Sequence, residues 1–375
     1  MCEVDLLQRL MRPVTLSTLA GAVLACSVFG SVAAVFAQMR NEEFSDRALR
    51  IEAGLTKRLP GRWSAVKDEQ DVNIISGDPY PRRDKNSFVP ALGQLVWELP
   101  QSVASQVTFS ARVTFSARVY QTENNVRVGY VRLPRFDYHP EAARKFAEVI
   151  AIFERETQAL VVDEINNPGG SMFQMYALLS YLTDKPLKVP KHQFRFQQDD
   201  VDAASEVVDR VNANSLTSED TPESVAYARF VLSEVKEGRG LGTKNTRPGF
   251  VGGIAEIAPA PNHYTKKVVV AVNENSFSAA EFLAAIMQDN HQAIIFGQRT
   301  GGAGGLVRSV ELSPVFKKAG ISDFKLTWTL AWRSSGSPIE DLGVTPDIFY
   351  NITVDDLRSG YVGYREALLA TAVKQ

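Results

Sequence analysis

Residues 266–305 read KKVVVAVNENSFSAAEFLAAIMQDNHQAIIFGQRTGGAGG. This order predicts an apolar strand, a tight polar turn, a helix that begins at Ser278, a second strand and a glycine-rich loop. The start of a helix carries N–H groups without intrahelical partners and the positive end of the helix dipole. A nucleophilic hydrolase needs such donors, because the attacked carbonyl oxygen becomes negatively charged. Ser278 is therefore a candidate nucleophile.

The same serine also has a simpler explanation. Ser278 and Glu281 have the spacing of a capping box, in which the serine hydroxyl bonds the third helical N–H group and the glutamate bonds back. Most such boxes only start helices. The local pattern alone therefore favours capping over catalysis.

The chain N-terminal to this unit alternates between strand and helix patterns. Strands are predicted at residues 126–133 and 159–165, and helices at residues 140–157 and 170–182. The apolar stripe of the first helix consists of Phe146, Val149, Ile150 and Phe153. The alternation predicts an α/β core of stacked strand–helix units.

Two motifs in these units resemble a known family. VNENSFSAAEF (residues 272–282) is similar to the nucleophile segment of tail-specific, S41-type serine peptidases, and DEINNPGGS (residues 163–171) is similar to their Asn-Pro-Gly-Gly turn. The resemblance implies a ClpP/crotonase-like spiral of strand–helix units with a small N-terminal extension, and attack by Ser278. The backbone that it implies for the oxyanion hole is that of Gly169 or Gly170 together with Ala279.

The segment after the predicted helix resembles one branch of that family. Most members pair their serine with a lysine 25 residues later, and 278 + 25 = 303 is Ala303 here. The chlamydial protease-like activity factor branch instead uses Ser–His–Glu, and its glycine-rich loop is similar to TGGAGG (Thr300–Gly305). GSPIEDLGVTP (residues 336–346) resembles the segment that carries the catalytic glutamate of the branch, which falls on Glu340.

The general base is the unidentified part of the predicted site. In the branch that the chain resembles, the catalytic histidine lies far upstream, in a region that precedes a PDZ-like domain. The histidines of this chain are His139, His192, His263 and His291, and none has a context that resembles that base. His139 is a weak candidate, and a separate chain or a preceding region could also supply the base. A serine without a base loses several orders of magnitude in rate.

Composition excludes several other classes of function. The net charge is −2, and no long basic run occurs, so the sequence gives no support to nucleic-acid binding. Cys2 and Cys26 are the only cysteines, and no HExxH motif is present. The TGGAGG loop lacks the Lys-Ser/Thr that follows a phosphate-binding loop. We expect the chemistry to require neither a metal nor an organic cofactor.

The N-terminus predicts export. Residues 14–37 contain no charge, follow Arg9 and Arg12, and end in a sequence that suits cleavage before Gln38. A membrane anchor is the competing interpretation, since about 20 apolar residues can span a bilayer. Met11 could be the true start. We expect a periplasmic, cell-surface or extracellular protein that meets a membrane only through this segment.

The resulting assignment has three parts: a signal peptide at 1–37, an N-terminal extension with a linker and a β segment at 38–120, and an S41-type peptidase domain at 121–375. The extension contains a predicted helix at 41–57 and the tandem repeat VTFSAR-VTFSAR at 107–118, which predicts one long strand, or an edge strand or hairpin with either copy pairing.

Two further segments belong to the predicted peptidase domain. Residues 199–247 are acidic and predict helices that form either a solvated layer or a lid over the substrate. Residues 324–332 alternate as one strand that leads to Glu340.

These patterns lead to one leading function and two alternatives. The leading function is an exported serine endopeptidase that acts on polypeptides through Ser278 and Glu340, with a homodimer left open. The runner-up is a catalytically impaired homologue that binds polypeptide segments, or a truncated gene product. Acyl-CoA chemistry on the related crotonase scaffold is disfavoured by the serine at the helix start.

Overall fold

The computed structural model describes residues 91–374, except 107, 110–111, 138, 218–219, 221, 239–246, 249–253, 310–311, 313, 319 and 322–323. The predicted signal peptide at 1–37 and the predicted helix at 41–57 lie outside the described residues. Among the helices of the described part, none is long and apolar enough to cross a membrane.

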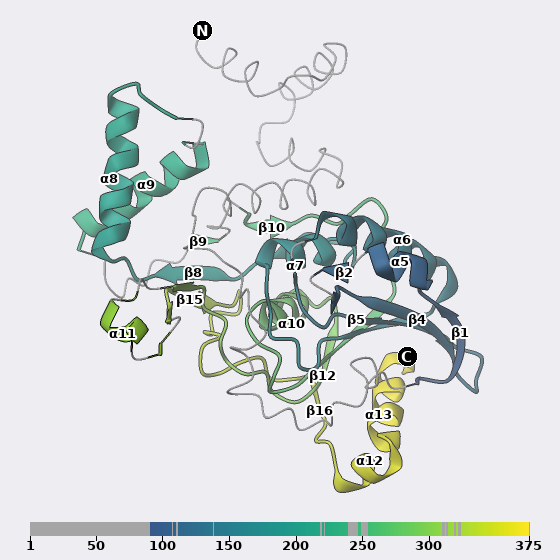
Figure 1. The fold of residues 1–375 in the computed structure, drawn as a ribbon. Helices are drawn as coiled ribbons and strands as arrows, with labels where there is room; N and C mark the ends of the chain where they lie inside the picture. The colour runs from purple at the N-terminus through teal and green to yellow at the C-terminus, as the bar shows by residue number, and fades with distance from the viewer. Residues whose placement is uncertain are drawn as a thin grey trace, which may run out of the picture.

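A seven-stranded mixed sheet forms the centre of the molecule (Figure 1), in the order β1-β4-β5-β6-β11-β12-β16. Pairing is antiparallel from β1 to β5 and parallel from β5 to β16. The strands are β1 Gln94–Glu98, β4 Ser116–Gln121, β5 Arg127–Arg132, β6 Ala159–Asp163, β11 Lys267–Val272, β12 Ile294–Gly297 and β16 Ile348–Phe349. Part of the predicted N-terminal extension thus belongs to the main sheet.

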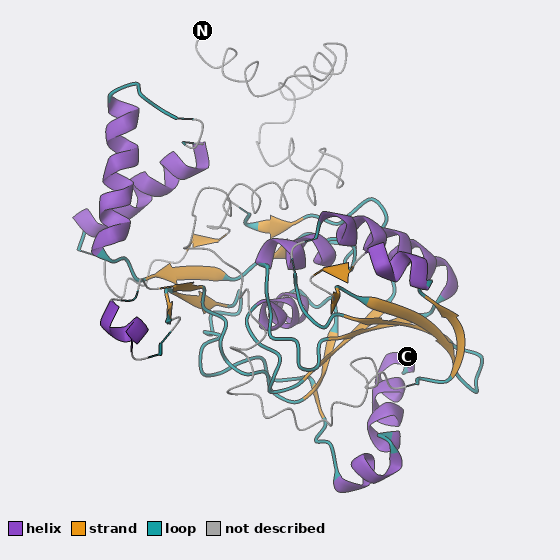
Figure 2. Ribbon diagram, viewed as in Figure 1, coloured by secondary structure: helices purple, strands orange, loops and turns teal. Residues whose placement is uncertain are grey.

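Helices cover both faces of this sheet, as Figure 2 shows. One face packs against α6 (Pro140–Glu156), α7 (Met172–Leu179) and α10 (Ala279–Asp289), and the other packs against α13 (Val362–Val373). The central strand β6 is buried along its whole length. A parallel strand covered on both faces is expected to be continuously apolar, and ALVVD fits that rule.

Most predicted elements are confirmed. The two predicted strands and the helix over 140–157 appear as β5, β6 and α6, and the apolar stripe of α6 is buried. Helix α7 is shorter than the predicted range 170–182, because its N-cap is Ser171 and its C-cap is Ser180. The α/β fold class is confirmed.

The tandem repeat forms a hairpin rather than one long strand. β2 (Thr108–Phe109) pairs antiparallel with β3 (Arg112–Val113), so the first copy pairs with its own last residue and with the first residue of the second copy. The last three residues of the second copy, Ser116 to Arg118, belong to β4.

The prediction of one strand at 324–332 is wrong. The segment contains β14 (Lys325–Thr327) and β15 (Thr329–Trp332), which belong to different sheets. Between them the buried Trp328 donates its N–H to the carbonyl of Leu306 at 2.7 Å. The chain therefore changes partner at Trp328 although its alternating pattern continues.

The acidic segment forms helices α8 (Gln198–Asn212) and α9 (Pro222–Lys236), which confirms its predicted helical character. These helices pack against each other and project from the body of the molecule (Figure 1). Their buried faces pack in an aromatic cluster with Phe196, Trp328 and Phe194 of β8 (Lys191–Phe194). The lid function stays a prediction.

Candidate active site

Ser278 lies between strand β11 and helix α10, at the carboxyl end of the parallel part of the sheet. Its backbone has φ 53° and ψ −119°, which is unusual for a residue with a side chain. Such a conformation costs on the order of 1–3 kcal/mol and persists only where the surroundings impose it. The turn is held by Ser276, whose hydroxyl donates to the carbonyl of Glu164 at 2.8 Å. The predicted capping box is present, so Ser278 does cap α10.

The Asn-Pro-Gly-Gly turn lies directly against this serine. A Cβ atom added to Gly169 would be 2.7 Å from Ser278 Cβ and 2.8 Å from Ala279 N, and the φ of Gly169 is +90°. The N–H of Phe277 donates to the carbonyl of Asn167 at 2.9 Å. Only glycine permits this approach at this φ, so Gly169 brings the two predicted motifs together.

Two N–H groups near this contact are available to a substrate. The N–H of Gly169 is occupied, because it donates to Asn167 Oδ1 at 2.8 Å. Within the part of the chain that the structure describes, the N–H groups of Gly170 and Ala279 have no acceptor. Ser278 is partly exposed and Gly170 is exposed. The geometry therefore favours Gly170 over Gly169 as the partner of Ala279.

Glu281 connects the serine turn to the glycine-rich loop. This carboxylate is fully buried. It accepts hydrogen bonds from Ser278 N (3.2 Å), Thr300 Oγ1 (2.7 Å), Gly302 N (2.6 Å) and Ala303 N (2.7 Å). Burial raises its pKa, and these four donors oppose that rise. The sequence predicted only the cap between Ser278 and Glu281, and the contacts with the loop were missed.

Glu340 lies on the other side of the same loop. A Cβ atom added to Gly305 would be 2.7 Å from Glu340 Oε1, and Gly302 accepts the N–H of Asp341 at 2.9 Å. Glu340 Oε2 accepts the N–H of Ala331 at 2.9 Å. Glu340 Oε1 is buried and has no partner among the described residues. Burial raises the pKa of Glu340 to about 7, and the nearby Glu281 adds to the effect. One loop thus connects the surroundings of Ser278 and Glu340.

No described histidine is within hydrogen-bond distance of the Ser278 hydroxyl. His139 is partly exposed at the start of α6, and its Nδ1 accepts the N–H of Ala142 at 3.2 Å. Nδ1 therefore already has a donor, and the neutral ring carries its proton on Nε2. Neither nitrogen is then free to accept a proton from serine, so this hydrogen bond counts against His139 as the base.

The remaining histidines have other surroundings. His192 is buried, stacks on Phe282 at 5.4 Å, and has its pKa lowered to about 4 by burial. His263 Nδ1 is 2.5 Å from the carbonyl of Ala260. His291 follows the C-terminal end of α10, on the order of 15–20 Å from Ser278 by helix rise. The base of the predicted triad therefore stays unidentified.

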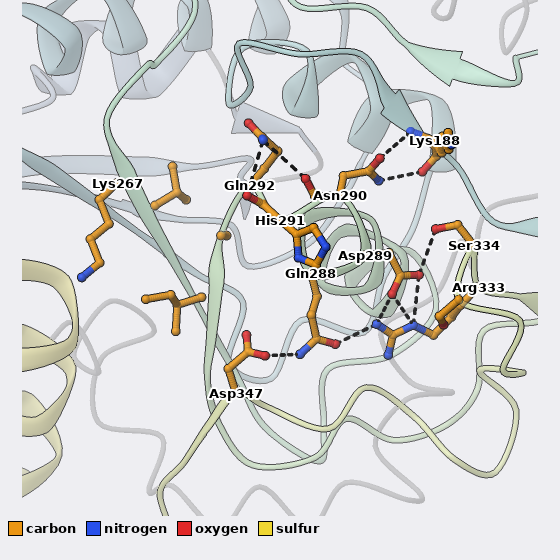
Figure 3. Close-up of a pocket in the computed structure, with 14 residues that line it drawn as sticks. Lys188, Lys267, Gln288, Asp289, Asn290, His291, Gln292, Arg333, Ser334 and Asp347 are labelled. Atoms are coloured by element: carbon orange, nitrogen blue, oxygen red, sulfur yellow. Dashed lines mark hydrogen bonds and ion pairs between the residues drawn. The ribbon is translucent and has the colours of Figure 1, made fainter.

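A pocket of about 1000 Å³ borders the C-terminal end of α10 (Figure 3). Its polar side chains bind one another: Arg333 donates to Asp289 at 2.5 Å and to Gln288 at 2.7 Å, and Gln288 donates to Asp347 at 2.8 Å. Ser278 lies at the other end of the helix and does not line this pocket. The pocket is therefore separate from the candidate site.

The comparisons with known proteins agree with the motifs. A family model described as peptidase family S41 matches residues 127–350. An uncharacterised protein of Chlamydia muridarum is 33% identical over 341 residues, covering 82% of this chain and 53% of that protein. A protein of Chlamydia trachomatis is 31% identical over 337 residues, covering 83% and 53%. The chain thus spans about half the length of these curated relatives.

Similar solved structures include two of mature CPAF. The crystal structure of mature CPAF matches with a TM-score of 0.61 and 31% identity, over 75% of this chain and 56% of that one. The structure of mature CPAF complexed with lactacystin matches with a TM-score of 0.62 and 30% identity, over 76% and 57%. These likenesses support the CPAF-like branch within the family.

Proposed function

The chain belongs to peptidase family S41, and from that membership we propose that it is a serine endopeptidase with Ser278 as its nucleophile. The observation that carries the proposal is the contact of Gly169 with Ser278 and Ala279. It places a partly exposed hydroxyl beside two N–H groups that have no acceptor in the described part of the chain. A capping serine would need no such neighbour.

The proposed reaction follows from these groups. The Ser278 hydroxyl attacks the carbonyl carbon of a peptide bond while its proton passes to a base. The N–H groups of Gly170 and Ala279 donate to the oxyanion that forms. The C–N bond then breaks, the base protonates the leaving amine, and water hydrolyses the acyl-enzyme.

Glu340 suits the task of orienting an imidazole. Its buried Oε1 has no partner among the described residues and can accept one N–H from a ring that enters the site. Once ionised, the carboxylate stabilises the imidazolium that forms during attack. We propose that a histidine outside the described residues supplies this ring, from a region that precedes them or from another chain.

A second candidate function is binding without cleavage. The observation that favours it is the lack of a described histidine at Ser278. An exposed groove can hold an extended polypeptide by main-chain hydrogen bonds.

The uncharged segment at 14–37 favours export of the protein in either case, catalytic or binding. Measurement of the intact mass of the protein made in cells would test this, because cleavage before Gln38 removes residues 1–37.

Labelling with a fluorophosphonate tests the proposed nucleophile. The full chain, Ser278→Ala and Ser334→Ala are treated in parallel, and the modified peptide is identified by mass spectrometry. Ser334 is the matched control, because it lies near the other end of α10 and only donates to Asp289 at 3.2 Å. We expect labelling at Ser278 in the wild type and in Ser334→Ala, and none in Ser278→Ala. A folded wild-type chain that does not label would favour the binding homologue.

A further inference from the structure

We propose that Glu281 is a positioning residue for catalysis, which holds the Ser278 turn and the Thr300–Gly305 loop in one fixed arrangement. This inference rests on the proposed function, because it assigns a role toward the same nucleophile. It goes beyond helix capping. A capping glutamate needs only the N–H of the capped residue, and Glu281 binds three further donors from a different segment.

The carboxylate divides its bonds between the two segments. Oε1 accepts from Thr300 Oγ1 and Gly302 N, whereas Oε2 accepts from Ala303 N and Ser278 N. Every group that faces it is therefore acting as a donor. A protonated carboxyl would direct its own O–H at one of these donors, so the donor set favours the charged form.

The loop that Glu281 holds also leads to Glu340. The carbonyl of Gly302 accepts the N–H of Asp341 at 2.9 Å, and Gly305 packs beside Glu340 Oε1. A shift of the loop would therefore move the acceptor for the incoming imidazole relative to Ser278. Such misplacement lowers the rate of attack much more than it lowers substrate affinity.

Thr300 makes the arrangement rigid from the opposite side. Its hydroxyl oxygen accepts the N–H of Val344 at 2.7 Å while its proton goes to Glu281. Gly343 packs against Thr300, where an added Cβ would be 2.4 Å from the Thr300 carbonyl oxygen. Thr300 thus connects Gly343 and Val344, which follow Glu340, to the carboxylate of Glu281.

The variant Glu281→Gln tests this role with almost no change in shape. An amide replaces one acceptor oxygen with an NH₂ group, and in either orientation that group faces at least one backbone N–H. Asp356→Asn is the matched control. Asp356 is a buried carboxylate that accepts from Thr353 N (2.9 Å) and Tyr364 N (2.8 Å) near the start of α13.

The first measurement is the dependence of the Ser278 labelling rate on fluorophosphonate concentration. We expect Glu281→Gln to lower the limiting rate constant at least about tenfold, with the half-saturating concentration changed less than about twofold. Asp356→Asn should change neither value, although it also loses stability. An equal limiting rate in Glu281→Gln and wild type would overturn the inference, as would an equal fall in Asp356→Asn.

Hydrogen exchange separates this inference from the proposed function. Even if wild-type Ser278 does not label, Glu281→Gln should speed amide exchange in peptides covering 276–281 and 299–306. The change should be about tenfold at Gly302 and Ala303, because each loses its charged acceptor. Asp356→Asn should leave these peptides unchanged. Unchanged exchange in Glu281→Gln would refute the positioning role whatever the labelling result.

Discussion

At the N-terminal end of helix α10, the N–H groups of Ala279 and of Gly170 in the neighbouring turn have no acceptor among the described residues, whereas at its C-terminal end the helix borders a pocket where Arg333, Asp289 and Gln288 bind one another. The pocket beside the second end (Figure 3) is lined by neither Ser278 nor Glu281. A hollow alone is therefore a poor guide to chemistry in this molecule. What distinguishes the first end is a partly exposed serine beside donors that a reaction could use.

Gly169→Ala is the variant that should affect the N-terminal end of α10 most strongly. The new methyl group would lie 2.7 Å from Ser278 Cβ at a φ of +90°, so the turn and the helix start must separate. We expect Ser278 labelling to fall by about 10³-fold or more, with a loss of about 2–4 kcal/mol in unfolding free energy. Both are measured on the same preparation, by labelling and by urea denaturation.

Gly360→Ala is the control for that variant. Gly360 has φ +71° at the C-terminal cap of α12 (Val354–Ser359), and an added Cβ would meet nothing within 4 Å. It should lose about 1 kcal/mol from backbone strain and keep full labelling. If both variants labelled alike, the contact between Gly169 and the helix start would have no catalytic meaning.

The sequence predicted the framework of this end and missed its connections. The periodicity of α6 and the apolar run of β6 are local, so they were readable without the fold. The bonds from Glu281 to Thr300 and Gly302 depend on the path of a loop about 20 residues further on. No local pattern encodes that path, and the family motifs supplied only the residues.

The incorrect prediction of one strand at residues 324–332 has the same cause, because a local pattern does not encode contacts between distant segments. Its alternation was genuine, and Thr329 and Ala331 are buried as the pattern requires. However, the change of sheet at Trp328 is set by the partner Leu306, which lies far away in the sequence. Tertiary context therefore overrides a local pattern.

The pH dependence of Ser278 labelling tests the proposed role of Glu340. Burial raises its pKa to about 7, so the carboxyl is largely protonated below that pH and ionised above it. If the ionised form orients the base, the limiting labelling rate should rise with pH through about 7, by about 10-fold or more. The corresponding Glu340→Gln variant should lack this step. A step that survives in Glu340→Gln would assign the titration to another group.

The contribution of Glu340 to the stability of the folded chain should change with pH in the opposite direction. A carboxyl whose folded pKa is raised contributes stability at low pH, and that contribution disappears as pH rises through about 7. The free energy of unfolding of wild type relative to Glu340→Gln should therefore fall between pH 4.5, the ordinary pKa of a glutamate, and about pH 7, and stay level above that. Activity and stability changing together in the same direction would contradict ionisation as the cause.

The smallest effect on labelling is expected at the other end of α10. Arg333 and Asp289 form an ion pair whose side chains are 12% and 6% exposed, so Arg333→Ala leaves a buried carboxylate without its cation. We expect a loss of about 3 kcal/mol in unfolding free energy and a labelling rate within about twofold of wild type. Lys188→Ala, which changes an exposed residue of the same pocket, should alter neither quantity.

Arg333→Ala also tests whether the two ends of α10 are independent. If Arg333→Ala slowed labelling as strongly as it lowered stability, the pocket and Ser278 would be coupled through the packed turns of α10. An unchanged rate in a destabilised protein would instead show that the N-terminal end is fixed by its own contacts, namely Gly169 and Glu281. The bonds that converge on Glu281 predict the second result, because none of them involves a residue that lines the pocket.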